Sequence, residues 1–192
     1  DYTFYENNLK QKFKIGYSKF WGMDKFFDLN LMEGEVLEKI DEAIVFLRKN
    51  GLQVEEIESI NWPHNPLEIF LTMWQSGASN LARKVSEEDY SKLEPSFLRF
   101  VEKGNHYTMF DLMDAETKRA ENAIHLKQIF SNIDAMIGPS LPALPFNSYK
   151  NVPEGFEEDD LFSWLPFTYP FNLTKNPAST INVNFSKSGL PI

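Results

Sequence analysis

Four adjacent residues near the end of the sequence, Ser186-Lys187-Ser188-Gly189, are of the types that could perform nucleophilic catalysis. A serine nucleophile needs a base within hydrogen-bonding reach and donors for the oxyanion that develops. Adjacent residues in a polar turn point away from one another, so we interpret this stretch as a surface turn. The local motifs Gly-x-Ser-x-Gly and Ser-x-x-Lys do not occur in the sequence. We therefore predict no catalytic residue within this chain.

Metal and cofactor sites are not predicted either. The histidines His64, His106 and His125 do not stand at metal-ligand spacing from one another, and there is no cysteine to complete a zinc site. Gly-x-Gly does not occur, so the sequence lacks both a phosphate-binding loop and a dinucleotide fingerprint. The acidic run 157–160 could bind a cation, but a solvated face or an acidic first turn of a helix is the favoured interpretation.

Composition narrows the class of protein. The 192 residues carry a formal net charge of −9 and scattered basic residues, which argues against a nucleic-acid partner. Hydrophobic residues make up 42% of the chain, enough for the core of one domain or of a large part of one. No apolar run is long enough to span a membrane. The absence of cysteine fits a cytoplasmic protein.

The segment 166–177, PFTYPFNLTKNP, is both rigid and apolar. Its prolines restrict the backbone, and its aromatic residues would be out of place in a solvated linker. We predict a non-helical or broken-helical wall of a small-molecule site, lined by Trp164 and Tyr169, with Trp74 as a further candidate. The alternative is that these rings simply pack in the core.

Hydrophobic periodicity predicts an α/β protein with a mixed, largely parallel sheet and flanking helices. A strand at 13–18, an amphipathic helix over 35–50 and a strand at 52–59 form a predicted βαβ unit. Thr108 and Asp111 indicate a capped helix start. The other expected elements are helices at 67–84, 94–103 and 108–132, a strand at 134–140, an irregular loop at 141–160, a short helical stretch near Leu161 and a last strand at 180–186.

Several of these stretches together resemble the amidase signature family of serine amidohydrolases. The resemblance is carried by FKIGYSKFWG, TMWQSGASNLARK, IFSNIDAMIGPSLPALPF and WLPFTYPFNLTKNPASTINVNFSKSGLPI. It covers nearly the whole chain in order. The sequence departs from the family pattern at Lys175, where glycine is more common, and at Ile181-Asn182-Val183, where Val-Pro is more common.

The resemblance implies a large α/β fold and a catalytic triad of serine, cis-serine and lysine that acts on amides through an acyl-enzyme. The residues of that triad match nothing in this sequence. We therefore expect residues 1–192 to form a single partial domain, the substrate-side portion of an amidase that lacks the N-terminal catalytic loop and the C-terminal end. The resemblance implies a small-molecule amide substrate and these substrate-binding positions: Phe70, Trp74, Trp164, Tyr169 and Asn172.

Two other functions remain open. The chain could be part of the A-type component of a tRNA-dependent amidotransferase, which uses the same fold to release ammonia, or a non-enzymatic module that binds a ligand. An incomplete site would leave its aromatic wall partly exposed, which favours self-association or binding to a missing remainder of the same protein.

Overall fold

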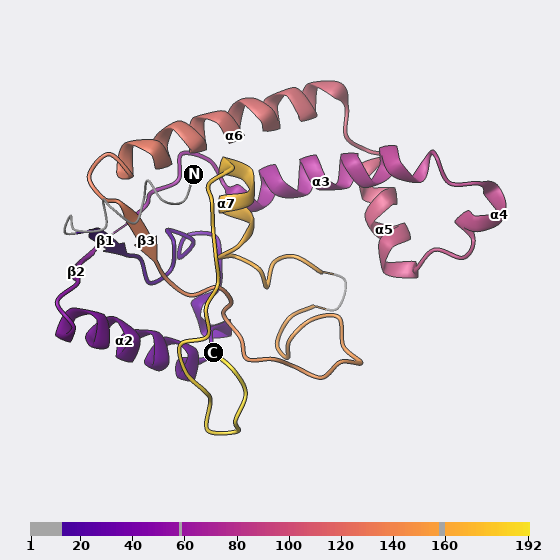
Figure 1. The fold of residues 1–192 in the computed structure, drawn as a ribbon. Coiled ribbons are helices and arrows are strands. Elements are labelled where there is room, and N and C mark those ends of the chain that lie inside the picture. The colour runs from indigo at the N-terminus through magenta and orange to yellow at the C-terminus, as the bar shows by residue number, and fades with distance from the viewer. Residues whose placement is uncertain (1–12, 58, 158–159) are drawn as a thin grey trace, which may run out of the picture.

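The computed structural model of the protein describes residues 13–57, 59–157 and 160–192. Its sheet has three strands, β1 (Lys14–Tyr17), β2 (Gln53–Glu56) and β3 (Ala135–Ile137), in the order β2-β1-β3. Both strand pairs are parallel, with Ile15 opposite Val54 on one side and Ala135 on the other. The predicted α/β class with a largely parallel sheet is confirmed, and Figure 1 shows the sheet at one end of the molecule.

The predicted βαβ unit is also confirmed. Helix α2 (Gly34–Lys49) connects β1 to β2 and buries Val36, Ile40 and Ile44 on one face. Gly51 follows the C-cap residue with a φ of +85°, a left-handed conformation that glycine adopts without steric cost. The helix therefore ends where the sequence predicts.

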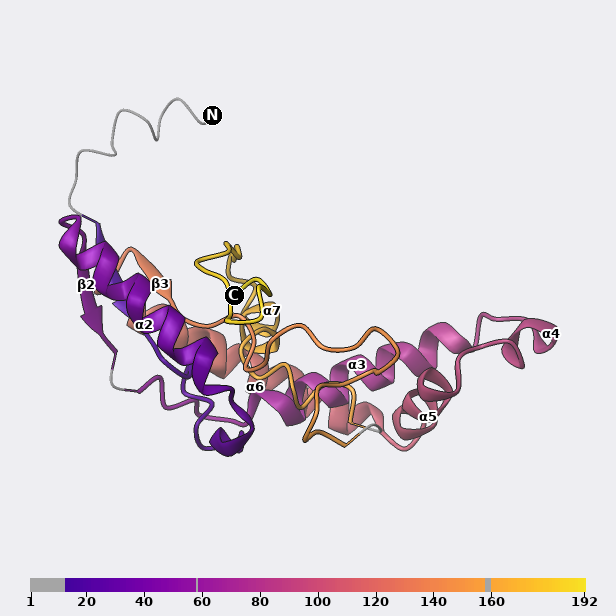
Figure 2. The same ribbon diagram turned by 90° about the horizontal axis from the view of Figure 1, so that it is seen from below.

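Four helices build an arm that leads away from the sheet. Helix α3 (Pro66–Ala82) and helix α6 (Met109–Ile129) lie side by side, and α4 (Glu87–Tyr90) and α5 (Pro95–Gly104) occupy the far end (Figures 1 and 2). The predicted capping box of Thr108 and Asp111 is present at the start of α6. A small separate core joins α3 to α5 and consists of Ala78, Ala82, Phe100 and Val101.

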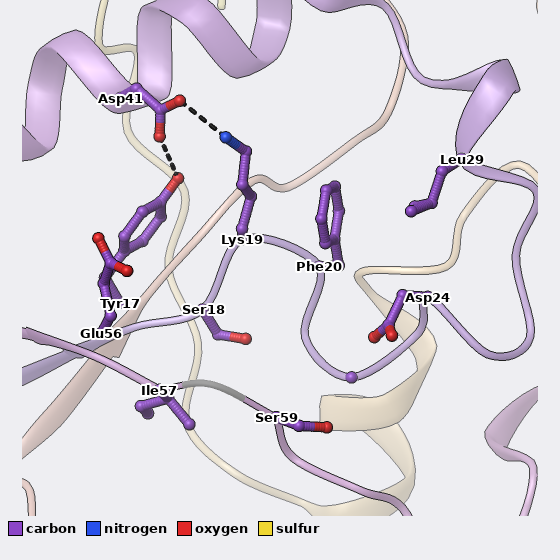
Figure 3. Close-up of a pocket in the computed structure, with 11 residues that line it drawn as sticks. Tyr17, Ser18, Lys19, Phe20, Asp24, Leu29, Asp41, Glu56, Ile57 and Ser59 are labelled. Atoms are coloured by element: carbon purple, nitrogen blue, oxygen red, sulfur yellow. Dashed lines mark hydrogen bonds and ion pairs between the residues drawn. The ribbon is translucent and has the colours of Figure 1, made fainter.

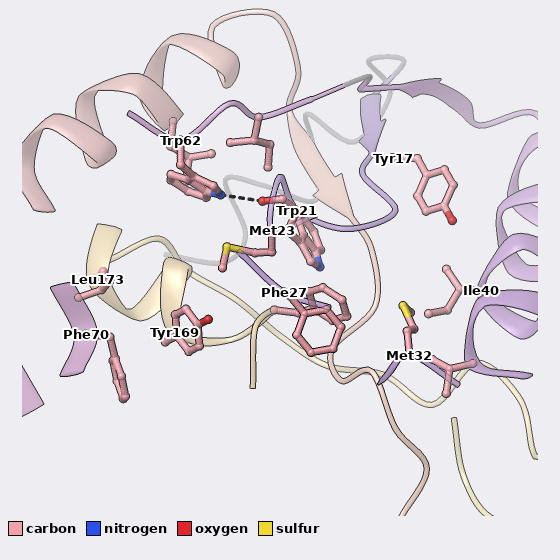
Figure 4. Packing of buried hydrophobic residues seen from close by; sticks show 14 of the residues in the cluster. Tyr17, Trp21, Met23, Phe27, Met32, Ile40, Trp62, Phe70, Tyr169 and Leu173 are labelled. Carbon is pink, nitrogen blue, oxygen red and sulfur yellow. Dashed lines mark hydrogen bonds between the residues drawn. The ribbon is translucent and has the colours of Figure 1, made fainter. Parts of the chain in front are cut away.

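Tryptophan side chains connect the sheet region to the loops around it. The indole N–H of Trp62 donates to the carbonyl oxygen of Trp21 at 2.7 Å (Figure 4). The indole N–H of Trp21 in turn donates to the carbonyl oxygen of Pro139 at 2.6 Å. A Cβ added at Gly138 would lie 2.3 Å from the carbonyl oxygen of Ser18, so the chain after β3 packs directly on the chain after β1. Together these contacts fix the loops that follow the carboxyl ends of β1 and β3.

The aromatic segment 166–177 contains a short helix, α7 (Tyr169–Thr174). Pro170 lies in its first turn, where a backbone N–H has no helical partner in any case, so proline is tolerated there. The segment is thus helical in its centre. Lys175 ends the helix with a φ of +58°, the left-handed conformation in which the family more often has glycine.

Two predicted elements are wrong and two were missed. The stretch near Leu161 forms turns and no helix. Segment 180–186 joins no sheet: an isolated antiparallel bridge links Phe185 to Pro191, because no neighbouring strand in the described residues is available to pair with it. The missed elements are the 3₁₀ turn η1 (Leu29–Leu31) and α4. Residues 158 and 159 of the acidic run lie outside the described residues.

Candidate functional site

Two helices supply most of the predicted substrate-binding residues. Phe70 and Trp74 lie one turn apart on α3, so their side chains leave the same face of that helix. Tyr169 and Asn172 belong to α7, which packs against α3. Trp164 lies in the turn that precedes α7. The structure therefore brings residues from distant parts of the sequence to one junction of α3 and α7.

Three of these side chains form a run of nearly parallel rings, here called the aromatic stack (Phe70, Trp74 and Tyr169). The rings of Phe70 and Tyr169 are 5.3 Å apart between centroids, with 25° between their planes. The rings of Phe70 and Trp74 are also 5.3 Å apart, at 21°. Figure 4 shows Phe70 and Tyr169 beside the buried core. Offset stacking of this kind stabilises aromatic pairs beyond the burial of their surface.

Two further phenylalanines support the aromatic stack and were not predicted as part of it. The ring of Phe162 lies 5.3 Å from that of Phe70 and 6.3 Å from that of Trp74, tilted against both. Phe100 on α5 contacts Phe162 at 5.1 Å. A signal for Phe162 was available, because it stands only two residues before Trp164 in the aromatic stretch. Nothing local in the sequence indicates that Phe100 reaches it.

Exposure rises along the aromatic stack from the core to the surface. Tyr169 is 2% exposed and Phe70 is 8% exposed, whereas Trp74 is 55% exposed. Burial, with a contribution from the negative charge of Asp160, raises the pKa of the Tyr169 phenol above its usual range. The phenol therefore stays neutral at physiological pH. The stack presents one accessible ring, backed by two buried ones.

Trp164 and Asn172 lie outside the aromatic stack. The indole of Trp164 packs edge-on against Phe146, with centroids 5.3 Å apart and planes at 89°. Its buried N–H has no hydrogen-bond partner among the described residues. Asn172 is exposed on α7. The structure thus assembles Phe70, Trp74 and Tyr169 and leaves the other two candidates at its margins.

The Ser186–Gly189 turn shows no catalytic arrangement. The hydroxyl groups of Ser186 and Ser188 contact each other at 2.9 Å. The backbone N–H of Lys187 donates to the carboxylate of Glu35 on α2 at 2.6 Å. These contacts fit the interpretation of this stretch as a surface turn. Within the described residues, no cluster of histidine and carboxylate side chains could hold a metal ion.

A polar hollow of about 420 Å³ opens at the carboxyl ends of β1 and β2 (Figure 3). The Asp41 carboxylate accepts hydrogen bonds there from the Tyr17 hydroxyl at 2.7 Å and from the Lys19 ammonium group at 2.9 Å. Burial raises the pKa of the Asp41 carboxyl, but the hydrogen bonds from Lys19 and Tyr17 outweigh it and leave that pKa below its usual value. Burial and the bond to Asp41 raise the pKa of the Tyr17 phenol.

We expect Asp41→Asn to reduce the loss of stability in acid. Because the pKa of Asp41 is lower in the folded state, its contribution is present above the unfolded pKa of about 3.9 and is lost as the pH falls through the folded value. The side chain is about half exposed, so the contribution is about 0.2–1 kcal/mol. Urea denaturation of both proteins at pH 6 and pH 3 measures it. The same pH dependence in both proteins would contradict this expectation.

Comparison with protein families gives a match over the full sequence. The family model described as amidase matches residues 1–192. The chain belongs to the amidase family. The amidase fold is also found among solved structures, where a bacterial aryl acylamidase of the amidase signature family superposes with a TM-score of 0.75 at 17% identity, covering 94% of this chain and 39% of that one.

Curated amidase-family relatives are distant but match most of the chain. An acylamidase of Rhodococcus erythropolis is 23% identical over 169 residues, which cover 85% of this chain and 35% of the relative. The A-type component of a glutamyl-tRNA(Gln) amidotransferase of Dehalococcoides mccartyi is 26% identical, with 94% of this chain and 40% of the relative covered. The chain thus spans less than half the length of these two relatives.

No helix within the described ranges combines the length and the apolar composition needed to cross a membrane.

Proposed function

We propose that this chain is the substrate-facing portion of an enzyme that hydrolyses carboxylic amides to an acid and ammonia or an amine. The observation that carries the proposal is the match of the amidase family model to residues 1–192. The family resemblance implies that a serine, a cis-serine and a lysine perform the chemistry through an acyl-enzyme, and none of them corresponds to a residue of this chain. The chain contributes a binding surface.

The aromatic stack is the surface we assign to that role. Its accessible ring, Trp74, is held in place by the buried ring of Phe70, so little side-chain entropy is lost when a ligand contacts it. Phe70 and Tyr169 supply the apolar surroundings that small-molecule sites use. Trp164 and Asn172 border the same helix junction and complete the proposed substrate-binding set. No metal or cofactor is part of the proposal.

The A-type component of a tRNA-dependent amidotransferase is the second candidate. It is supported by the similarity to relatives of that name, which match up to the whole of this chain. The segment WLPFTYP resembles stand-alone amidases more closely, which favours the first candidate. A neighbouring gene for the other components of the amidotransferase would favour the second. A non-enzymatic ligand-binding module is a third candidate and would need no catalytic residues elsewhere.

We expect the isolated 192-residue chain to release no ammonia or amine from simple aliphatic and aryl amides. The physical reason is that the Ser186–Gly189 turn provides no base directed at a serine and no oxyanion donors. Hydrolysis is measured by amine release from acetanilide and by ammonia release from acetamide. Turnover that purifies with the chain and survives Ser186→Ala and Ser188→Ala would contradict the division of labour proposed here. The longer protein that carries this chain should hydrolyse amides, and its failure to do so would contradict the proposed function.

Partners and location are part of the proposal as well. The exposed ring of Trp74 offers a contact for a second copy of the chain or for the remainder of the same protein. A cytoplasmic location is supported by the absence of cysteine. The net charge of −9 argues against a nucleic-acid partner.

A further inference from the structure

The aromatic stack ends in a ring whose outer face is open. One face of the Trp74 indole lies against Phe70, with 5.3 Å between the ring centroids. More than half of the surface of this residue, 55%, is nevertheless accessible. With one face covered by Phe70, an exposure of this size has to include the opposite face. The stack therefore offers a flat aromatic surface on which another ring can lie.

The neighbouring rings hold this surface in a fixed orientation. Phe70 is buried between α3 and α7 and stacks on Tyr169, which is itself buried. Phe162 lies beside Phe70 and Trp74 with its plane tilted by 57° and 56° against them, and Phe100 supports it from α5. The indole is thus backed from one side and bordered on another. A ring held in this way loses little conformational freedom when a ligand stacks on it.

We propose that the exposed face of Trp74 binds the aryl group of an aromatic amide, such as an anilide, as the next ring of the aromatic stack. This proposal rests on the function proposed above and specifies its substrate class. The planes of successive rings differ by only 21° and 25°, an orientation that a planar ring can continue. A saturated ring of similar size lacks the π-system and gains only from burial, whereas an aromatic pair gains about 0.5–1.5 kcal/mol more.

The test compares two amides that differ only in the character of the ring. Acetanilide and N-cyclohexylacetamide carry the same acetamide group, and their dissociation constants for the 192-residue chain are measured by NMR titration of the tryptophan indole N–H signals. We expect acetanilide to bind roughly three- to tenfold more tightly. Trp74→Leu should remove this preference, and Trp74→Phe should retain part of it. The matched control is Phe110→Leu, which alters an aromatic residue that is 75% exposed on α6 and should leave the preference unchanged.

The outcomes separate this inference from the proposed function. Equal affinity for the two amides, binding of neither, or a preference that survives Trp74→Leu would overturn the assignment of Trp74 to an aryl group. If the longer protein that carries the chain hydrolyses amides but does not distinguish these two rings, only the inference about the substrate class fails. If the chain prefers acetanilide and the longer protein hydrolyses neither amide, the proposed function fails and the aryl-binding surface stands.

Discussion

Replacing Gly104 with alanine should lower the free energy of unfolding by about 3 kcal/mol or more, because the last turn of α5 touches the backbone of α3. A Cβ at position 104 would lie 2.1 Å from the carbonyl oxygen of Gln75 and 2.4 Å from the hydroxyl oxygen of Ser79. That hydroxyl cannot turn away freely, since it donates to the carbonyl oxygen of Val101 on α5 at 2.6 Å. The two helices would have to separate. Urea denaturation of the purified protein measures the change.

Gly77→Ala is the matched control for this substitution. Gly77 lies in α3, two residues after Gln75, and nothing would lie within 4 Å of an added Cβ. Alanine is a better helix former than glycine, so this variant should be more stable by about 0.5–1 kcal/mol. The same change in side chain thus has opposite expected signs at two positions of one helix crossing. A Gly104→Ala variant as stable as the wild type would show that α5 can move away from α3 at little cost, which contradicts the close contact between the two helices.

Replacing Asn122 with leucine should lower the free energy of unfolding by about 2–4 kcal/mol. Asn122 is 1% exposed in the middle of α6, and its side-chain amide donates to the carbonyl oxygen of His64 at 3.0 Å. Its side-chain oxygen accepts the backbone N–H of the same histidine at 3.1 Å. Leucine has a similar volume but leaves both backbone groups of His64 without these partners, at about 1–3 kcal/mol for each group that is buried.

Two measurements check the role of Asn122. Urea denaturation gives the stability, and amide hydrogen exchange reports on the N–H of His64, which should exchange faster in the variant. Asn132→Leu is the control, because Asn132 is exposed just beyond the end of α6 and its replacement should have little effect. If the His64 amide stays as protected in Asn122→Leu as in the wild type, the loop before α3 is held by other contacts. Candidates for those contacts are the bonds from His64 to Glu121 and from His125 to the carbonyl oxygen of Ile60.

Elements whose signals are local were predictable from the sequence. The capping box at Thr108 involves residues three apart, and the left-handed Gly51 directly follows the helix that it ends. The buried face of α2 follows from its 3.6-residue periodicity. Segment 180–186 shows the limit of this reasoning. Its alternation of apolar and polar residues is typical of a strand, but a strand forms only where another strand pairs with it, and no pattern within the segment specifies that partner.

The candidate site was predictable only in part, for a similar reason. The prolines and aromatic residues around Tyr169 indicate a shaped apolar surface, and the family resemblance pointed to Phe70 and Trp74 on α3. The contacts among these rings depend on how α3, α5 and α7 meet in space. Phe162 and Phe100 join the group only through that packing. Trp164, close in sequence to Tyr169, turns instead toward Phe146.

The strand order β2-β1-β3 also affects the time course of synthesis. The middle strand, β1, is made first, and the backbone N–H of Lys14 finds the carboxylate of Asp134 only 120 residues later. At about 5–20 residues per second, a ribosome needs roughly 6–24 s to make that stretch. During this interval β1 can pair with β2 on one side, while its other edge is open to any extended chain nearby. The nascent protein is therefore most vulnerable to misassembly before β3 leaves the ribosome, and a chaperone that covers this edge would protect it.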